Sequence, residues 1–264
     1  MKKILILMAA LVLITGFAIA EDIGLTAGLE GGVYNATKAN DGDMTPFIMP
    51  YIYYDNSFGD LDVYAELDYE VAFDDDTYMG VYFDLDLAYN LSLGSASTLS
   101  FLLEDYWEFY LAPEISDPLT PYMMELYPGV KFNQEFDFGS LYAKAQVPMY
   151  LLPGYKDADF ACDLWFTAGW KSTFGLGIYV TEKFALAPDA EHSAIKAVVN
   201  YGTDTFNAEL KSEFIGKSDI WINLTPKFEY YFNAFTFYVK CDFTGIGTDF
   251  DVEIKPTLGV TFSF

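Results

Sequence analysis

Apolar and polar residues alternate along most of the chain, and this is the period of a β-strand. The clearest run covers residues 60–73, where Leu, Val, Ala, Tyr and Phe at odd positions alternate with mostly acidic even positions. Because successive side chains of a strand point to opposite faces, one face is apolar and the other strongly acidic. The polar stretch Asp74-Asp75-Asp76-Thr77 leads into a second run of the same kind, so the two runs predict a β-hairpin.

Extending this period beyond residue 20 predicts about fourteen strands and no helix. The predicted fold class is all-β. Taken with the two ends of the chain and its composition, the prediction is a transmembrane antiparallel up-and-down β-barrel, in which an even number of strands brings both ends of the barrel domain to one side. One wrong hairpin would remove two strands, so twelve is the alternative. The predicted strands lie near residues 22–34, 46–55, 60–73, 77–91, 98–111, 120–132, 139–151, 160–170, 174–186, 193–202, 205–214, 218–231, 234–243 and 252–264.

Some residues fit this assignment poorly. Prolines inside predicted strands remove ladder hydrogen bonds, so some of them should mark strand ends or bulges. Asp105 falls on the apolar face of the fifth strand, which suggests that the embedded part ends near Leu103 or that a bulge shifts the phase. The prolines concerned are Pro50, Pro128, Pro148, Pro226 and Pro256.

The N-terminal residues predict export. Lys2 and Lys3 precede an apolar run that closes on Ala18-Ile19-Ala20. This pattern is typical of a secretory signal peptide over residues 1–20, cleaved after Ala20, with residues 21–264 as a single barrel domain. A helical membrane anchor is the alternative, but the run is shorter than about 18 residues and meets a small-x-small cleavage site.

The C-terminal residues carry a second signal, in which Thr257, Gly259, Phe262 and Phe264 are spaced within a strand that ends on alternate aromatic residues. This pattern resembles the assembly signal of bacterial outer-membrane β-barrel proteins. The resemblance implies a location in the cell outer membrane, contact with outer-membrane lipid, and recognition of the last strand by the barrel-assembly machinery.

Composition agrees with a barrel in a membrane. The chain is 52% hydrophobic and 19% aromatic, yet it carries a net charge of −25, and a transmembrane barrel needs both an apolar belt and a polar lumen. A soluble β-sandwich would also alternate, but it would not explain the C-terminal pattern. Arginine is absent and all 14 basic residues are lysine, which argues against nucleic-acid partners and bidentate phosphate clamps.

Catalysis, cofactors and metals are not expected. The chain has one histidine, His192, in a predicted loop, and most enzymes of the outer membrane need a histidine base beside a nucleophile or acid. The run Asp74-Asp75-Asp76 lacks the spacing of an EF-hand calcium loop, so it is interpreted as a solvated acidic turn.

The predicted inward faces divide into an acidic side and a mixed side. Charge on the lipid-facing side costs roughly 2–4 kcal/mol at the bilayer midplane. The lysines inside the predicted strands, and Lys171 at a strand end, all fall in the inward register. Strands three to five contribute the acidic pore-lining candidates Asp60, Asp62, Glu66, Asp68, Glu70, Asp84, Asp86, Glu104 and Glu108. Later strands contribute the basic pore-lining candidates Lys131, Lys144, Lys196, Lys211, Lys227, Lys240 and Lys255.

This distribution predicts a transverse field that enriches cations. In architecture and export signals the chain resembles small porins, and the resemblance implies passive diffusion of small hydrophilic solutes, with cations favoured by the excess of acids. The alternative is a non-conducting structural or surface-interaction (adhesin-like) barrel, in which paired charges only fill the interior.

Overall fold

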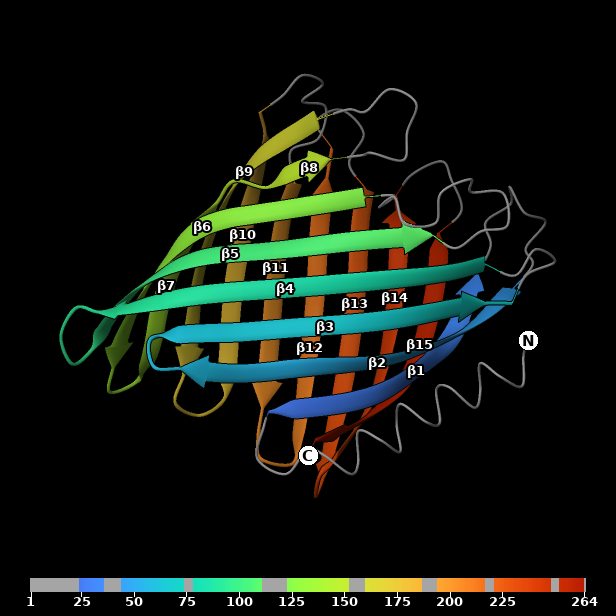
Figure 1. The fold of residues 1–264 in the computed structure, drawn as a ribbon, viewed down its shortest axis with the longest axis horizontal. Helices are drawn as coiled ribbons and strands as arrows, with labels where there is room; N and C mark the ends of the chain where they lie inside the picture. Colours follow the sequence, from blue (N-terminus) through green and yellow to red (C-terminus); the bar gives the residue numbers. More distant parts are fainter. Residues whose placement is uncertain are drawn as a thin grey trace.

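The computed structural model describes residues 24–35, 44–73, 78–110, 123–151, 160–186, 194–216, 221–247 and 252–263. They form one antiparallel sheet of fifteen segments in up-and-down order, closed by pairing of β1 with β15 (Figure 1). The segments are β1 Leu25–Asn35, β2 Met44–Phe58, β3 Leu61–Ala72, β4 Tyr78–Ser92, β5 Ser97–Tyr110, β6 Met123–Phe136, β7 Gly139–Gln146, β8 Met149–Leu151, β9 Phe160–Ser172, β10 Leu176–Ala185, β11 Ala194–Gly202, β12 Phe206–Ile215, β13 Trp221–Phe232, β14 Phe235–Ile246 and β15 Glu253–Ser263.

The segments β7 and β8 are two parts of one strand, so the barrel has fourteen strands. Gln146 pairs with Gly129 and Met149 pairs with Leu126, which keeps one register across the interruption. The interruption lies at Pro148, which has no N–H to donate, although its carbonyl oxygen still accepts from the Asp163 amide at 2.9 Å. The prediction of fourteen strands is therefore confirmed, and the alternative of twelve is wrong.

Pro148 agrees with the prediction that some of the prolines mark strand ends, and the other four do not interrupt their strands. Pro50, Pro128, Pro226 and Pro256 lie inside β2, β6, β13 and β15, so only Pro148 separates two segments. Each of these strands continues because its neighbours still supply the remaining ladder bonds.

Asp105 does not mark a bulge. β5 keeps one register with both neighbours at this point, where Asp105 pairs with Leu85 of β4 and Leu126 of β6. The suggestion of a phase shift is therefore wrong, and Asp105 lies on the outer face with these leucines.

The two ends of the barrel differ in their connections. Short turns at 59–60, 137–138 and 233–234 lie at the end where β1 begins and β15 ends, because the strands run up and down in order. In Figure 1 the strands β2–β6 pass in front of β11–β15, so the sheet encloses an interior between two walls. No helix in these described ranges is long and apolar enough to cross a membrane.

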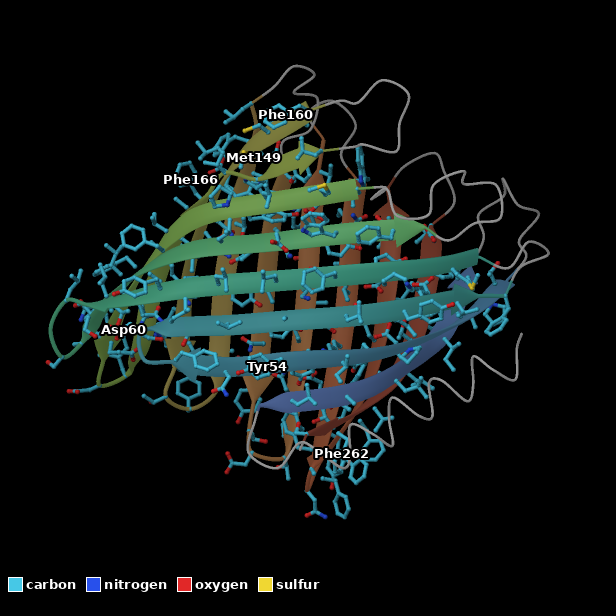
Figure 2. The ribbon with its side chains drawn as sticks, viewed as in Figure 1. Tyr54, Asp60, Met149, Phe160, Phe166 and Phe262 are labelled. Carbon is cyan, nitrogen blue, oxygen red and sulfur yellow. The ribbon has the colours of Figure 1, made fainter. Side chains whose placement is uncertain are left out.

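The outer face of the sheet is an apolar surface. In β14, for example, Phe235, Phe237 and Val239 alternate with interior residues and are 38%, 46% and 46% exposed. Phe160 and Phe166 extend from the sheet in the same way (Figure 2). Exposed apolar side chains all around a closed sheet are typical of a barrel whose outer solvent is lipid.

The C-terminal signal residues belong to the strand that closes the barrel. Thr257 is 2% exposed on the interior face, and the Phe262 ring lies 4.8 Å from the Phe235 ring. Gly259 provides room for a side chain of the neighbouring strand, because a Cβ there would lie 2.1 Å from Cζ of Tyr238. Residues 1–20 of the predicted signal peptide, and Phe264, lie outside the described residues.

Gly259→Ala is expected to lower the free energy of unfolding by about 1–3 kcal/mol, the usual cost of overpacking. Urea unfolding of the refolded barrel, followed by tryptophan fluorescence, measures the change. Gly202→Ala is the matched control, since a Cβ at Gly202 would first meet the flexible Asn207 side chain at 3.3 Å. Equal effects of the two substitutions would show that the Tyr238 ring does not need the space above Gly259.

Candidate functional site

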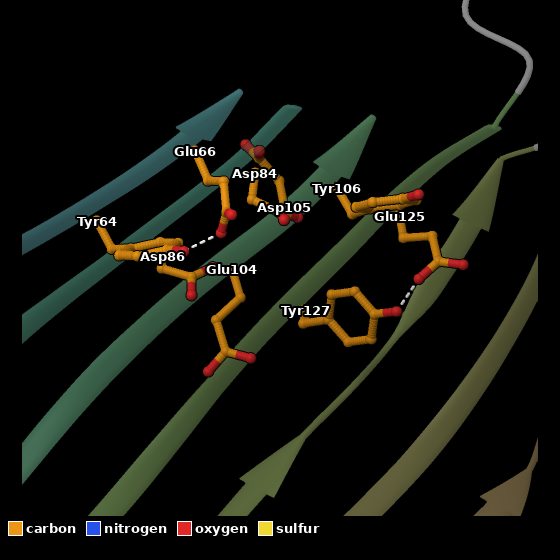
Figure 3. A pocket seen from close by; sticks show the side chains of 9 residues that line it. All are labelled: Tyr64, Glu66, Asp84, Asp86, Glu104, Asp105, Tyr106, Glu125 and Tyr127. Carbon is orange, nitrogen blue, oxygen red and sulfur yellow. Dashed lines mark hydrogen bonds between the residues drawn. The ribbon is translucent and has the colours of Figure 1, made fainter. Parts of the chain in front are cut away.

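The predicted acidic residues of β3, β4 and β5 meet on neighbouring rungs of the interior face. Glu66 pairs with Asp84, and Asp86 pairs with Glu104. They surround a cavity of 440 Å³, shown in Figure 3. Its lining consists of five interior carboxylates, three tyrosines and one further aspartate: Glu66, Asp84, Asp86, Glu104, Glu125, Tyr64, Tyr106, Tyr127 and Asp105. We call this the acidic cavity.

Asp105 has a different position from the other lining residues. It alternates with Glu104 and Tyr106 along β5, so its side chain lies on the opposite face of the sheet. The carboxylates that face the interior are therefore those of Glu66, Asp84, Asp86, Glu104 and Glu125.

Glu125 was not among the predicted pore-lining residues. It lies on β6, where it pairs with Tyr106 of β5 and Tyr150 of β8. The signal was present in the sequence, because Glu125 lies an even number of positions from Lys131 and so shares its face.

Four other predicted acidic residues lie on the same wall but outside this cavity. Asp62 accepts hydrogen bonds from Ser57 and Asn90, each at 2.6 Å. Glu70 accepts from Tyr34 at 2.6 Å. Asp68 pairs in register with Tyr51 and Tyr82, and Glu108 is buried to 7% exposure.

Asp60 does not lie in a strand. β3 begins at Leu61, and Asp60 occupies the exposed turn after Gly59, at the end of the barrel (Figure 2). Gly59 has a φ of 67°, which favours glycine, so the turn closes one residue later than the alternating pattern indicated.

Tyrosine hydroxyls hold two of the cavity carboxylates. Tyr64 donates to Glu66 and Tyr127 donates to Glu125, each from two positions away on the same strand (Figure 3). A phenol fixes a carboxylate without neutralising it, since the donor carries no charge. The two tyrosines therefore add no positive charge to this wall.

One lysine reaches the acidic cavity among the residues that the structure describes. Lys144 Nζ lies 3.0 Å from Glu104 Oε1, and Gln146 donates to the other carboxylate oxygen at 2.8 Å. Lys144 thus neutralises one edge of the wall.

The remaining interior lysines alternate with acids on the other strands. Lys227 lies 2.7 Å from Glu229, and Lys211 lies 3.3 Å from Glu209. Lys240 lies 3.7 Å from Glu30, a residue that sequence reasoning did not single out. The pairs of Lys227 and Lys240 line a second cavity of 380 Å³, which also includes Tyr238 and Thr236 and shares Glu66 with the acidic cavity.

Three lysines rest on aromatic rings or lie beside hydroxyls. Lys131 lies 5.2 Å from the ring centre of Tyr142, and Lys255 lies 2.8 Å from the hydroxyl of Tyr34. Lys196 pairs in register with Thr181 and Glu213.

Two further lysines complete the set. Lys171 is exposed at the turn end of β9. Lys183 lies in β10 with its ammonium 2.7 Å from Glu213. No group of three or more His, Cys, Asp or Glu in the described part of the chain is arranged to hold a metal ion. His192 and residues 74–77 lie outside that part.

Comparison with known proteins supports the fold. The chain matches no protein-family model and no curated protein. It is similar in fold to a solved mutant of TodX, a monoaromatic hydrocarbon channel, with a TM-score of 0.55 and 8% identity over 91% of this chain and 90% of that one. It is also similar to OmpF of Salmonella typhi, solved with daunomycin, with a TM-score of 0.51 and 12% identity over 92% of this chain and 99% of that one. The protein therefore has the architecture of outer-membrane channels and porins.

Proposed function

We propose that this protein is an outer-membrane channel for passive diffusion of small hydrophilic solutes, with a preference for cations and no catalytic step. The observation that carries the proposal is the acidic cavity, where five interior carboxylates meet and Lys144 is the lysine that reaches them in the described structure. The fold shared with OmpF and the TodX channel supports a conducting barrel.

The preference for cations follows from the unequal walls. Acids of β3–β6 outnumber Lys131 of β6 and Lys144 at their edge, whereas acids and lysines alternate on β12–β15. A cleft lined by one sign of charge within low-dielectric walls raises the local concentration of the opposite ion. A cation crossing the interior would thus be stabilised along the β3–β6 wall.

The proposed location follows from the apolar outer face and the two terminal signals. A cleaved signal peptide over residues 1–20 would direct export. The barrel-assembly machinery would then read the strand that carries Thr257, Gly259, Phe262 and Phe264, and outer-membrane lipid would cover the apolar belt.

The reversal potential of single channels tests this proposal. We expect the refolded mature protein in a planar bilayer under a salt gradient to give stable conductance steps whose reversal potential reports cation selectivity. Heat-modifiable migration on gels provides evidence that the sample is folded. A folded barrel without conductance would support the structural or surface-interaction alternative, and anion selectivity would contradict the role of the acidic wall.

A further inference from the structure

Inside the barrel, lysine ammonium groups lie against aromatic rings whose polar atoms hold a carboxylate. Tyr34 donates to Glu70 at 2.6 Å, and Lys255 Nζ lies 4.1 Å from the centre of the Tyr34 ring. The ring face attracts the cation while the carboxylate supplies the countercharge. We call this arrangement an ammonium seat.

Two more ammonium seats occur on other strands. Tyr238 donates to Glu30 at 2.6 Å, and Lys227 Nζ lies 5.0 Å from the centre of the Tyr238 ring. The recurrence shows which chemistry the interior of this barrel uses to hold a primary ammonium. In the third seat, Trp165 donates to Asp163 at 3.2 Å and Lys183 lies 4.3 Å from the Trp165 ring.

The acidic cavity contains two aromatic–carboxylate pairs of the same kind. Tyr64 donates to Glu66, and Tyr127 donates to Glu125. In the described ranges no lysine lies within ion-pair distance of Glu66 or Glu125. Lys144 is paired with Glu104, and Lys183, which is paired with Glu213, acts on Glu125 only from a longer distance. Both pairs border one cavity of 440 Å³, with Asp84 and Asp86 on the strand between β3 and β5 (Figure 3).

The separation of the two pairs favours an extended ligand. Glu66 lies on β3 and Glu125 on β6, and three spacings between neighbouring strands amount to about 14 Å. A compact ion can reach only one end of this wall. A linear molecule with several ammonium groups can contact both ends and pass over Asp84 and Asp86.

We propose that the acidic cavity binds linear primary polyamines, with one ammonium on the Tyr64–Glu66 pair and another on the Tyr127–Glu125 pair. This inference deepens the proposed function, because it names the class of cation that the β3–β6 wall selects. Each terminal ammonium would donate hydrogen bonds to a carboxylate and lie against a tyrosine ring. The lysines of the seats show the contact with the ring, whereas Lys227 and Lys183 form their ion pairs with the nearby acids Glu229 and Glu213.

Isothermal titration calorimetry of the refolded, detergent-solubilised mature protein with spermidine tests the proposal. Saturable binding is expected, and decamethonium should bind about tenfold more weakly, because its quaternary ammonium groups have no N–H to donate. Equal affinity for both compounds would overturn the hydrogen-bonded seats, and absence of spermidine binding to folded protein would overturn the site.

Paired variants separate a specific site from general attraction. Glu66→Gln with Glu125→Gln should weaken spermidine binding at least tenfold. Asp62→Asn with Glu108→Gln removes the same charge from the same wall outside the cavity and should change the affinity less than threefold. If both double variants weaken binding equally, diffuse electrostatics accounts for it and the proposed site is wrong.

Calorimetry does not require an open pore, so the two proposals can fail separately. Binding without conductance would leave the polyamine site standing and remove the channel function. Conductance with cation selectivity but without spermidine binding would leave the channel function standing and remove the polyamine site.

Discussion

Val239→Lys is expected to lower the free energy of unfolding of the barrel in a lipid bilayer by about 2–4 kcal/mol. Val239 lies near the middle of β14, 46% exposed on the outer face. A lysine there would place an ammonium among lipid chains, where neither water nor a carboxylate can solvate it. Urea unfolding in lipid vesicles, followed by tryptophan fluorescence, measures the loss.

Thr236→Lys on the same strand is the matched control. Thr236 lines the 380 Å³ cavity together with Glu30 and Glu229, so the new ammonium would have carboxylates and polar groups within reach. Its effect on unfolding should remain below about 1 kcal/mol. Similar losses for both variants would contradict the assignment of inner and outer faces.

Removing four carboxylates from the acidic cavity should reduce cation selectivity by about tenfold, the lower end of the enrichment expected from a one-signed cleft. The variant combines Glu66→Gln, Asp84→Asn, Asp86→Asn and Glu125→Gln. The permeability ratio of potassium to chloride, obtained from the reversal potential in a salt gradient, measures the effect. Lys227 and Lys240 would remain, while Glu104, paired with Lys144, would be the one interior carboxylate left in the acidic cavity among the described residues.

The control removes the same total charge from the turn end of the barrel. Asp60, Glu135, Asp137 and Asp204 are all exposed at or beside short turns, where the Debye length of about 8 Å at physiological salt screens their field. Changing these four to amides should leave the permeability ratio within about twofold. An equal fall in both variants would mean that net charge, rather than the acidic cavity, determines selectivity.

The number of strands, and which side chains of each strand point inward or outward, could be predicted from the sequence. A transmembrane barrel exposes one face of its sheet to lipid and the other to a polar interior. That constraint produces an alternation that survives single exceptions such as Asp105. The prolines were harder to interpret, since a missing N–H weakens one bond while the rest of the ladder holds β2, β6 and β15 in register. In β13 the register with β14 shifts between Ile222 and Leu224, before Pro226.

The candidate site was predicted in outline but not in its pairings. Alternation placed Glu66, Asp84 and Asp86 on one face, but it cannot show that Tyr64 holds Glu66 or that Lys144 crosses from β7 to Glu104. Such contacts depend on cross-strand register and side-chain length. Asp60 was assigned to a strand because a turn boundary shifted by one residue leaves the period unchanged.

The pairing of β1 with β15 joins residues more than 200 positions apart, whereas every other ladder joins neighbours along the chain. Closing a long loop costs more entropy than forming a hairpin between neighbouring strands. We therefore expect the ladder between β1 and β15 to form last. Before it forms, the sheet has two unpaired edges that could pair with another polypeptide. The folding chain therefore passes through an open form that needs protection from aggregation until its first and last strands meet.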